Sequence, residues 1–447
     1  MDNFNAISWI NTLPFGWKAV KLKYLLEQRY GSMKVGPFGS QLSGKDFTNE
    51  GYWVYNQKVV VNQNFDETDT FINEDKYNSM SGFQVNRDDI LITTRGTIGR
   101  ICRIPKTYNS GIIHPCIIKF RIDEEKVLYD LINLLFNESN MIKDQLNFMS
   151  NATTIDVIYS GTLKNVYIPI APLNIQYKLI SYLKDKCFKI DAMTTDIQSE
   201  IDMLEKYKRS VITEAVTKGV DKKVEMKDSG IEWIGKIPKS WEIIRLRYVA
   251  DFYNGDRGVN YPSGDEFVDG GIPFLTSNNI HSEILDVSAD ITKYISKEKY
   301  QILGGAKIEL GDIIFCLRGS VGNCAVNKTI REGTVASSLV VIRSKKISPD
   351  FLNYVLNSPL VEIQTRSFMN GSCAANLSAE NVSSYLIVFP SRKEQEVISS
   401  FLNVKCEEIN SIISGKQKQL EILDSYKKSL IYEYVTGKKE VPSSWQN

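Results

Sequence analysis

The chain has 447 residues, of which 43% are apolar and 11% aromatic, and its 54 Lys and Arg nearly balance its 53 Asp and Glu to give a net charge of +1. This composition excludes collagen-like, mucin-like and wholly disordered proteins, and the length predicts two or three domains. No apolar run approaches the ~18–20 residues of a membrane helix, and the first residues lack the plan of a signal peptide, so we expect a soluble, cytoplasmic protein. The near-zero charge argues against a protein that coats nucleic acid by bulk electrostatics.

Residues 1–170 are expected to form a compact domain of mixed α and β structure. Short runs of β-forming residues alternate there with Gly, Asn and Pro, which favour turns. The run Asp89-Ile-Leu-Ile-Thr93 is typical of a buried strand, and it leads into the turn Arg95-Gly-Thr-Ile-Gly99. One short helix is expected near residues 126–145.

Residues 171–219 are expected to form a long helix. Apolar side chains recur every seven residues, and a second ladder that starts at Cys187 completes the alternating spacing of four and three found in a coiled-coil seam. No proline interrupts the stretch, and Gly219 stands where a helix stop is expected. The seam residues are Leu183, Ile190, Ile197, Leu204 and Val211.

The second half of the chain repeats the first. Residues near the start of the first copy return 224 positions later, and residues near its end return 219 positions later. The change of offset places small insertions within the first two thirds of a copy. Examples of recurring pairs are Trp9 and Trp233, Pro14 and Pro238, Trp17 and Trp241, Gln176 and Gln395, and Tyr207 and Tyr426.

This repeat defines the remaining elements along the chain. A linker at 220–230 leads to a second mixed domain at 231–389, which carries the turn Arg318-Gly-Ser-Val-Gly322 and a short helix near 351–357. A second long helix at 390–437 precedes a tail at 438–447, where Pro442-x-x-Trp445 is either a relic of a third copy or a chance match. The apolar seam of the second helix consists of Leu402, Ile409, Leu423 and Leu430.

The expected fold class is therefore α+β, with two similar mixed domains separated by a pair of long antiparallel coiled-coil helices in a pseudo-twofold repeat. A narrow seam suits a partner helix better than a sheet face, although each helix packing only on its own domain is the alternative. Lys208 and Lys427 interrupt the seam at equivalent positions, where polar residues commonly set register. At 1.5 Å per residue each helix spans ~60 Å, so the pair would act as a fixed spacer.

No group of residues predicts catalysis, cofactor binding or a metal site. The segment 39–45 has the spacing of a phosphate-binding loop, but Asp46 stands where Ser or Thr would bind magnesium. With only two histidines and no C-x-x-C among seven cysteines, a structural zinc site lacks ligands at usable spacing. We expect the cysteines to be reduced and mostly buried.

Basic residues gather in two equivalent windows around the Arg-Gly turns. Residues 90–122 hold six basic side chains and no acid, and residues 313–349 hold six basic side chains against Glu332 alone. Such faces suit a phosphate backbone, and ordinary solvated surface is the alternative. An Arg in a glycine turn can grip phosphate or guanine, or the turn can be purely structural. The candidate DNA-binding residues are Ser40, Gln41, Gln57, Lys58, Thr94, Arg95, Arg100, Arg103, Asn278, Asn279, Arg318, Ser320 and Arg343.

Two mixed domains, each followed by a long helix of matching sequence, resemble the specificity subunit of type I restriction-modification enzymes. The resemblance covers essentially the whole chain. The elements that carry it are Gly36-Pro-Phe-Gly-Ser40, the two Arg-Gly-x-x-Gly turns, the segments around Gln176 and Gln395, and the helix-closing segments 207–214 and 426–433.

The resemblance implies that each mixed domain is a target recognition domain that reads half of a split sequence in double-stranded DNA. The helices would set the gap between half-sites and dock two DNA adenine methyltransferase (modification) subunits. The chain itself would hold no cofactor, because the modification subunits would bind S-adenosylmethionine, and restriction or motor subunits, where present, would use ATP. The alternative is a pseudo-symmetric scaffold that binds proteins and no DNA.

Overall fold

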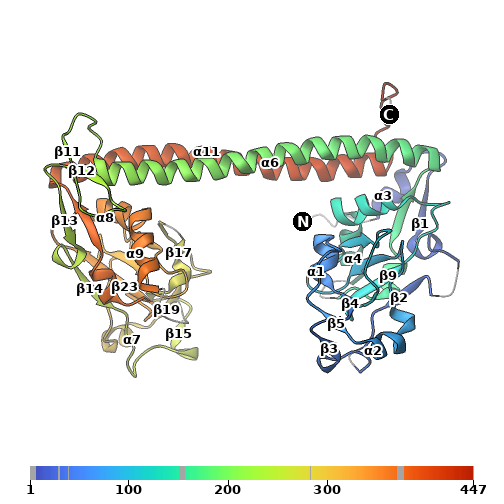
Figure 1. Ribbon diagram of the computed structural model, residues 1–447, viewed down its shortest axis with the longest axis horizontal. Coiled ribbons are helices and arrows are strands. Elements are labelled where there is room, and N and C mark those ends of the chain that lie inside the picture. Colours follow the sequence, from blue (N-terminus) through green and yellow to red (C-terminus); the bar gives the residue numbers. More distant parts are fainter. Residues whose placement is uncertain are drawn as a thin grey trace. The chain divides into compact units, whose positions relative to one another are not determined.

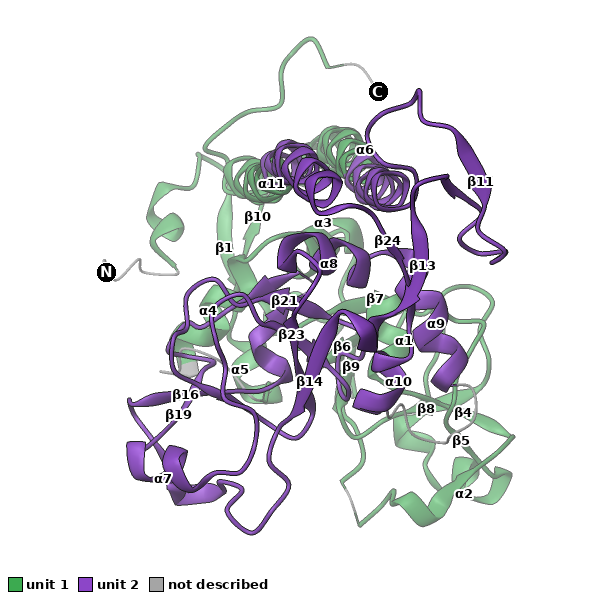
Figure 2. Ribbon diagram, turned by 90° about the vertical axis from the view of Figure 1, so that its left-hand side faces the viewer, with its two compact units in different colours: residues 1–197, 417–447 green, residues 198–416 purple. Residues whose placement is uncertain are grey.

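The computed structural model describes residues 7–28, 31–38, 40–150, 157–281, 283–369 and 377–445. The chain divides into two units, residues 1–197 with 417–447 and residues 198–416 (Figure 2). Two long helices, α6 (Leu173–Lys218) and α11 (Arg392–Val435), are seen in Figure 1, and each contributes one end to each unit (Figure 2). Each unit therefore contains a globular part and a stretch of both helices. No helix among the described residues is both long and apolar enough to cross a membrane.

The described residues of the first globular part form three sheets. One four-stranded sheet has the order β2-β9-β6-β7 and is antiparallel throughout. The other has the order β3-β5-β4-β8, in which only β4 and β8 are parallel, and β1 pairs with β10. The strands are β1 (Lys18–Lys21), β2 (Met33–Val35), β3 (Phe47–Thr48), β4 (Tyr52–Tyr55), β5 (Phe71–Ile72), β6 (Ile90–Thr93), β7 (Ile101–Arg103), β8 (Gly111–Ile113), β9 (Ile117–Phe120) and β10 (Tyr167–Ile170).

The short helix expected near residues 126–145 is a broken run in the structure. It consists of α3 (Tyr129–Asn133), a π-helical turn (Leu134–Glu138) and α4 (Met141–Ser150). The break occurs at Ser139, whose hydroxyl donates to the Leu135 carbonyl and accepts from the Met141 N–H, so that a new helix begins. The other helices of this part are α1 (Gln57–Asn62), α2 (Glu74–Ser79) and α5 (Ser160–Lys164).

The globular part of the second unit repeats this architecture. Its four-stranded sheets have the orders β14-β23-β20-β21 and β15-β19-β16-β22, the latter again with one parallel pair, β16 and β22, while β13 pairs with β24. Two hairpins, β11-β12 and β17-β18, are additional. The strands are β11 (Met226–Asp228), β12 (Lys236–Pro238), β13 (Glu242–Arg245), β14 (Ala250–Asn254), β15 (Phe267–Val268), β16 (Ile272–Leu275), β17 (Ile280–His281), β18 (Ile284–Leu285), β19 (Lys293–Ile295), β20 (Ile313–Cys316), β21 (Cys324–Val326), β22 (Thr334–Val335), β23 (Leu339–Ser344) and β24 (Leu386–Phe389).

The helices of the second globular part are α7 (Lys297–Ile302), α8 (Pro349–Leu356), α9 (Pro359–Met369) and α10 (Ala379–Ser383). The helix expected near residues 351–357 is α8, and α9 follows it where α4 follows α3 in the first unit. The matching order of strands and helices confirms the internal repeat and the α+β fold class with two similar mixed domains.

The long helices run antiparallel. In the first unit, the rings of Tyr182 and Tyr434 lie 4.9 Å apart, and Asp191 forms an ion pair with Lys427 (2.7 Å). In the second unit, Glu200 pairs with Lys416, and Lys405 of α11 interacts electrostatically with Tyr207 of α6. Within each unit, residues with higher numbers on α6 contact residues with lower numbers on α11, as expected for antiparallel helices.

Burial along α6 follows the expected seam. Between residues 191 and 210, all of which are described, the side chains that are not exposed are Thr194, Ile197, Ile201, Leu204 and Lys208. Leu183, Ile190, Leu402, Ile409 and Leu430 are buried, whereas Val211 and Leu423 are half-buried. The apolar side chains of the seam therefore face inward, as expected for two paired helices.

The two seam lysines have different partners. Lys427 pairs with Asp191 of the facing helix and with Glu138 of the first globular part. Lys208 pairs with Glu283, which lies between β17 and β18 of the second globular part. The expectation that both lysines fix the register of the pair therefore fits Lys427. Lys208 instead connects α6 to a hairpin that has no counterpart among the described residues of the first unit.

Buried glutamine side chains connect backbone segments at equivalent positions in both units. Gln145 accepts from the Tyr167 N–H (2.8 Å) and donates to its carbonyl (3.0 Å), and Gln364 does the same for Leu386. These bonds satisfy the free edges of β10 and β24, which would otherwise hold unpaired polar groups.

A second pair of glutamines opens the long helices. Gln176 accepts from the Leu128 N–H (3.0 Å) and donates to the Lys126 carbonyl (3.0 Å), and Gln395 accepts from the Ser348 N–H (2.7 Å). Both glutamines are fully buried. They therefore tie the first turn of each long helix to the segment that begins α3 or α8.

The six described cysteines are unpaired thiols, and five of them are buried, while Cys373 lies outside the described residues.

Candidate nucleic-acid interface

The two Arg-Gly turns have the same structure. Each connects the third and fourth strands of its antiparallel sheet, β6 to β7 and β20 to β21. Gly96 (φ 66°) and Gly319 (φ 77°) have left-handed conformations that side chains rarely adopt. A backbone bond closes each hairpin, from Gly99 to Thr93 (2.9 Å) and from Gly322 to Cys316 (3.0 Å). The glycines therefore have a structural role, and the turns project their arginines.

The helical turn that follows the parallel strand β4 or β16, which begins at Gln57 or Ser277, packs against each Arg-Gly turn. In the amide orientation that suits its neighbours, Gln57 donates to the Arg95 carbonyl (2.9 Å) and accepts from the Thr97 N–H (2.7 Å). A Cβ atom on Gly96 would lie only 2.9 Å from the Gln57 amide, so a larger residue would displace this contact. In the second unit, a Cβ on Gly319 would lie 3.2 Å from the Ser277 hydroxyl.

The structure thus brings together candidates from distant parts of the sequence. In the first unit, the half-buried Gln57 is followed by the exposed Lys58, and both lie beside the turn of the exposed Arg95. In the second unit, the exposed Asn278 follows Ser277 beside the turn that carries the exposed Arg318 and Ser320. Among the described residues, no acidic side chain forms an ion pair with either Arg95 or Arg318. Both guanidinium groups are available to a ligand.

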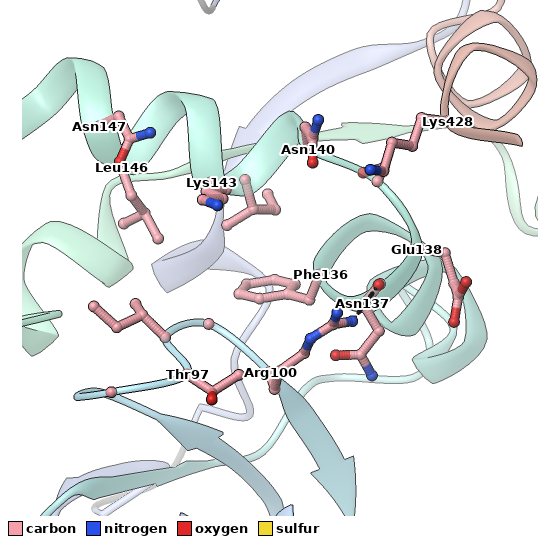
Figure 3. Close-up of a pocket in the computed structure, with 15 residues that line it drawn as sticks. Thr97, Arg100, Phe136, Asn137, Glu138, Asn140, Lys143, Leu146, Asn147 and Lys428 are labelled. Carbon is pink, nitrogen blue, oxygen red and sulfur yellow. Dashed lines mark hydrogen bonds between the residues drawn. The ribbon is translucent and has the colours of Figure 1, made fainter. Parts of the chain in front are cut away.

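An asparagine that sequence reasoning missed fixes the back of each hairpin. Asn137 accepts from the Ile101 N–H (2.9 Å) and donates to the Ile101 carbonyl (2.9 Å) and to Asn133 (2.8 Å). The Asn137 carbonyl accepts from Arg100 (Figure 3). In the second unit, Asn357 donates to the Cys324 carbonyl (3.2 Å) and to Asn353. The recurrence of both asparagines at an offset of 220 (137 to 357, 133 to 353) is the signal that could have found them.

Other candidates are used inside the fold. Arg103 pairs with Asp88 (3.1 Å) and Glu124 (2.8 Å), and Arg343 pairs with Asp312 (2.8 Å) and Glu309 (2.7 Å). The pKa of Arg343 is raised because the Asp312 carboxylate accepts its hydrogen bonds.

Two polar candidates are buried. Asn279 is fully buried, and its amide donates to the Asp286 carbonyl (3.0 Å) and to Thr292 (3.1 Å), so it supports its loop and does not face solvent. Thr94 is buried and donates to the Cys116 carbonyl (2.9 Å).

Ser40 and Gln41 lie in a separate loop. Both are exposed, and Gln41 accepts from the Phe38 N–H (3.2 Å). In the part of the chain that the structure describes, no hydrogen bond or ion pair joins this loop to the Arg95 turn. Gly39, which belongs to the motif at 36–40, lies outside the described residues. Gly36 is required by packing, because a Cβ there would lie 2.2 Å from the His114 carbonyl oxygen.

The two basic windows do not form continuous basic faces. Arg121 and Lys119 pair with Asp89, while Lys328 and Lys345 pair with Asp350 (3.3 Å) and Asp251 (2.6 Å), all acids outside the windows. The basic residues of the windows that form no ion pair among the described residues are Arg95, Arg100, Lys106, Arg318, Arg331 and Lys346. Of these six, Arg95, Arg100 and Arg318 lie in or directly beside the turns.

Within the described ranges, no three His, Cys, Asp or Glu side chains are grouped so that they could hold a metal ion. The arrangement offers arginine, amide and hydroxyl groups on two equivalent hairpins. These groups can recognise base edges and phosphates by hydrogen bonding.

Comparisons with known proteins agree with this arrangement. The family model described as "Type I restriction modification DNA specificity domain" matches residues 17–203 and 238–422. The chain is 26% identical over 367 residues to the type I restriction enzyme MjaVIII specificity subunit of Methanocaldococcus jannaschii, covering 80% of each chain. It is 24% identical to the putative MjaX specificity subunit of the same organism, covering 98% of this chain and 97% of that one.

A solved structure has a similar fold. It is described as "Structural basis underlying complex assembly and conformational transition of the type I R-M system", and its TM-score to this chain is 0.68 at 16% sequence identity. The match covers 96% of this chain and 99% of the solved chain. The similarity extends over both mixed domains and both long helices.

Proposed function

Because the chain belongs to the family of type I restriction-modification DNA specificity domains, we propose that it is the subunit that gives such a complex its DNA sequence preference, with each unit reading one half of a bipartite target. The observation that carries the proposal is found in both units: an exposed arginine on a glycine turn lies beside a polar side chain, Gln57 or Ser277, that follows the parallel strand. The chain is a specificity subunit and supplies recognition, while catalysis belongs to its partners.

Recognition would rest on a rigid hairpin that presents one arginine. Arg95 and Arg318 can each bond a guanine edge with two parallel hydrogen bonds, or a phosphate. Gln57 and Asn137 hold the Arg95 turn from two sides, so little freedom is lost when DNA binds. Lys58, Asn278 and Ser320 are the exposed neighbours that would complete the contacts.

The long helices would set the gap between the half-sites and dock two modification subunits. Several apolar side chains of the long helices are at least 50% exposed. Six of them form equivalent sets of three, Met203, Tyr207 and Ile412 in the second unit and Ile422, Tyr426 and Met193 in the first. The two sets correspond at an offset of 219 (203 to 422, 207 to 426, 193 to 412). Exposed apolar groups kept at equivalent positions support two equivalent docking surfaces.

These surfaces face away from the globular parts. Arg209 pairs with Glu362 of α9, and Tyr207 precedes it by two residues, which is about 200° around a helix. Lys428 lines a cleft beside α4, and Tyr426 precedes it by the same step. Among the described residues, both tyrosines accordingly remain more than half exposed.

Replacing Tyr207 by Asp is expected to remove one modification subunit from the complex, and replacing Tyr426 as well should remove both. A charge buried at an interface centre costs several kcal/mol, so each affinity should fall at least about tenfold. Native mass spectrometry of the co-purified complex measures the composition. The controls are Tyr24→Asp and Tyr248→Asp, because these exposed tyrosines of the globular parts also recur at equivalent positions. Equal losses in all four variants would contradict the docking assignment.

No cofactor is proposed for this chain. S-adenosylmethionine would be bound by the modification subunits, which would methylate adenine, and ATP by restriction or motor subunits where they are present. The proposal places the chain in the cytoplasm, together with the DNA that it would read.

Selection from a random duplex pool tests the function directly. The complex of this chain with its modification subunits should enrich a two-part sequence with a fixed gap. The same sequence should contain the methylated adenines that disappear from the genome when the gene is deleted. Absence of enrichment with modification subunits present would favour the protein-only scaffold instead.

A further inference from the structure

A cleft lies behind the Arg95 turn of the first unit. It has a volume of about 420 Å³ and is bounded by the turn residues 96–100 on one side and by the π-helical turn and α4 on the other (Figure 3). Three basic residues line it, Arg100, Lys143 and Lys428, against one acid, Glu138. The cleft and the exposed Arg95 therefore belong to the same hairpin.

The basic groups of this cleft are only partly neutralised. Glu138 is engaged by Lys427 (2.7 Å) outside the cleft lining. Lys428 pairs with Asp424 (2.6 Å) on its own helix, an exposed pair of the kind that contributes little. Arg100 uses one nitrogen on the Asn137 carbonyl, and Lys143 forms no hydrogen bond or ion pair among the described residues. A net positive charge remains in the cleft.

The second unit has a cleft at the equivalent place, but without this charge. Its volume is about 390 Å³, and it lies between residues 321–323 and helices α8 and α9. Asn323 occupies the position equivalent to Arg100 (offset 223), and Glu362 occupies the position equivalent to Lys143 (offset 219). Glu362 pairs with both Arg209, the equivalent of Lys428, and Arg366. The second cleft therefore satisfies its charges internally.

We propose that the cleft of the first unit binds a backbone phosphate of the DNA whose bases the Arg95 turn contacts, whereas the cleft of the second unit binds none. Arg and Lys side chains in a recess are suited to phosphate, and a contact to the backbone fixes position without reading sequence. The inference rests on the proposed function and adds an asymmetry to it. The first unit would supply more of the salt-dependent affinity than the second.

The test exchanges the charges of the two clefts. Lys143→Glu recreates the second unit's arrangement in the first, and Glu362→Lys does the reverse. The complex with modification subunits is titrated with its target duplex and with a random duplex at several salt concentrations. Lys143→Glu is expected to weaken both by about tenfold and to lower the slope of log affinity against log salt by about one. Glu362→Lys should raise the slope by about one, and the preferred sequence should stay unchanged in both.

The matched control is Lys222→Glu, which makes the same charge change at an exposed residue of the 220–230 segment. Equal slopes for Lys143→Glu and Lys222→Glu would overturn the proposal. The proposal would also be overturned if inorganic phosphate or ATP binds the wild-type cleft while the Lys143→Glu variant binds DNA as the wild type does. The phosphate in the cleft would then not come from DNA. The proposed function fails separately, namely if the wild-type complex shows no sequence preference. In that case the slope of log affinity against log salt on random duplex still tests the cleft.

Discussion

Replacing both Arg95 and Arg318 by Ala is expected to weaken binding of the target duplex by about 100-fold or more. An arginine with two hydrogen bonds to guanine discriminates by about 1–3 kcal/mol, and the two turns lie in different units, so their effects should add. Both side chains are exposed, and neither has an intramolecular ion pair among the described residues. The substitutions therefore leave no acidic partner unpaired. Folding should therefore be unaffected.

The single variants separate the half-sites. Arg95→Ala should relax the sequence preference in one half of the target and Arg318→Ala in the other, as measured by selection from a random duplex pool with each complex. Arg247→Ala is the control, because Arg247 is an exposed arginine of the second globular part that lies outside both turns. Unchanged preference in both halves would show that the turns are structural only.

Replacing Arg343 by Ala is expected to destabilise the second unit by about 3–5 kcal/mol. The substitution leaves the Asp312 carboxylate, which is 1% exposed, without its charged partner. Chemical denaturation of the full chain measures the loss. The sequence preference of the folded protein should be unaltered, because Arg343 is used inside the sheet.

A double variant separates the ion pair from the packing around it. Asp312→Leu combined with Arg343→Met removes both charges and should recover most of the stability, since two apolar side chains can replace a buried pair at little net cost. Arg366→Ala is a control, because its pair with Glu362 is exposed. If Arg343→Ala is as stable as Arg366→Ala, the buried pair is not important for folding.

The parts of the fold that depend on periodic patterns could be predicted from the sequence. The heptad ladder predicted the positions that are turned inward along α6 and α11, and the repeat predicted two domains of the same architecture. Both signals are local or internal to the chain, and neither requires knowledge of which strands pair.

The charges at the candidate site could not be predicted in the same way. The windows around the turns contain almost no acid, yet Asp88, Asp89 and Asp312 lie just before them and neutralise arginines across the sheet. Strand pairing brings residues 15 to 32 positions apart into contact, so a count along the chain misses these pairs. Asn137 was missed for a related reason, because its amide bonds to the backbone of a strand 36 residues earlier.

The route of the chain also has a consequence for the order in which the protein assembles on the ribosome. The core of the second unit draws on residues between 211 and 406, a single continuous stretch. The core of the first unit includes Leu430, Ile431, Tyr434 and Val435, which are synthesised after every residue of the second unit's core. Part of the apolar surface of the first unit therefore stays exposed until the end of α11 has been synthesised. The core of the second unit can be completed earlier. A chain that ends between residues 406 and 430 would contain the complete core of the second unit and an incomplete core of the first.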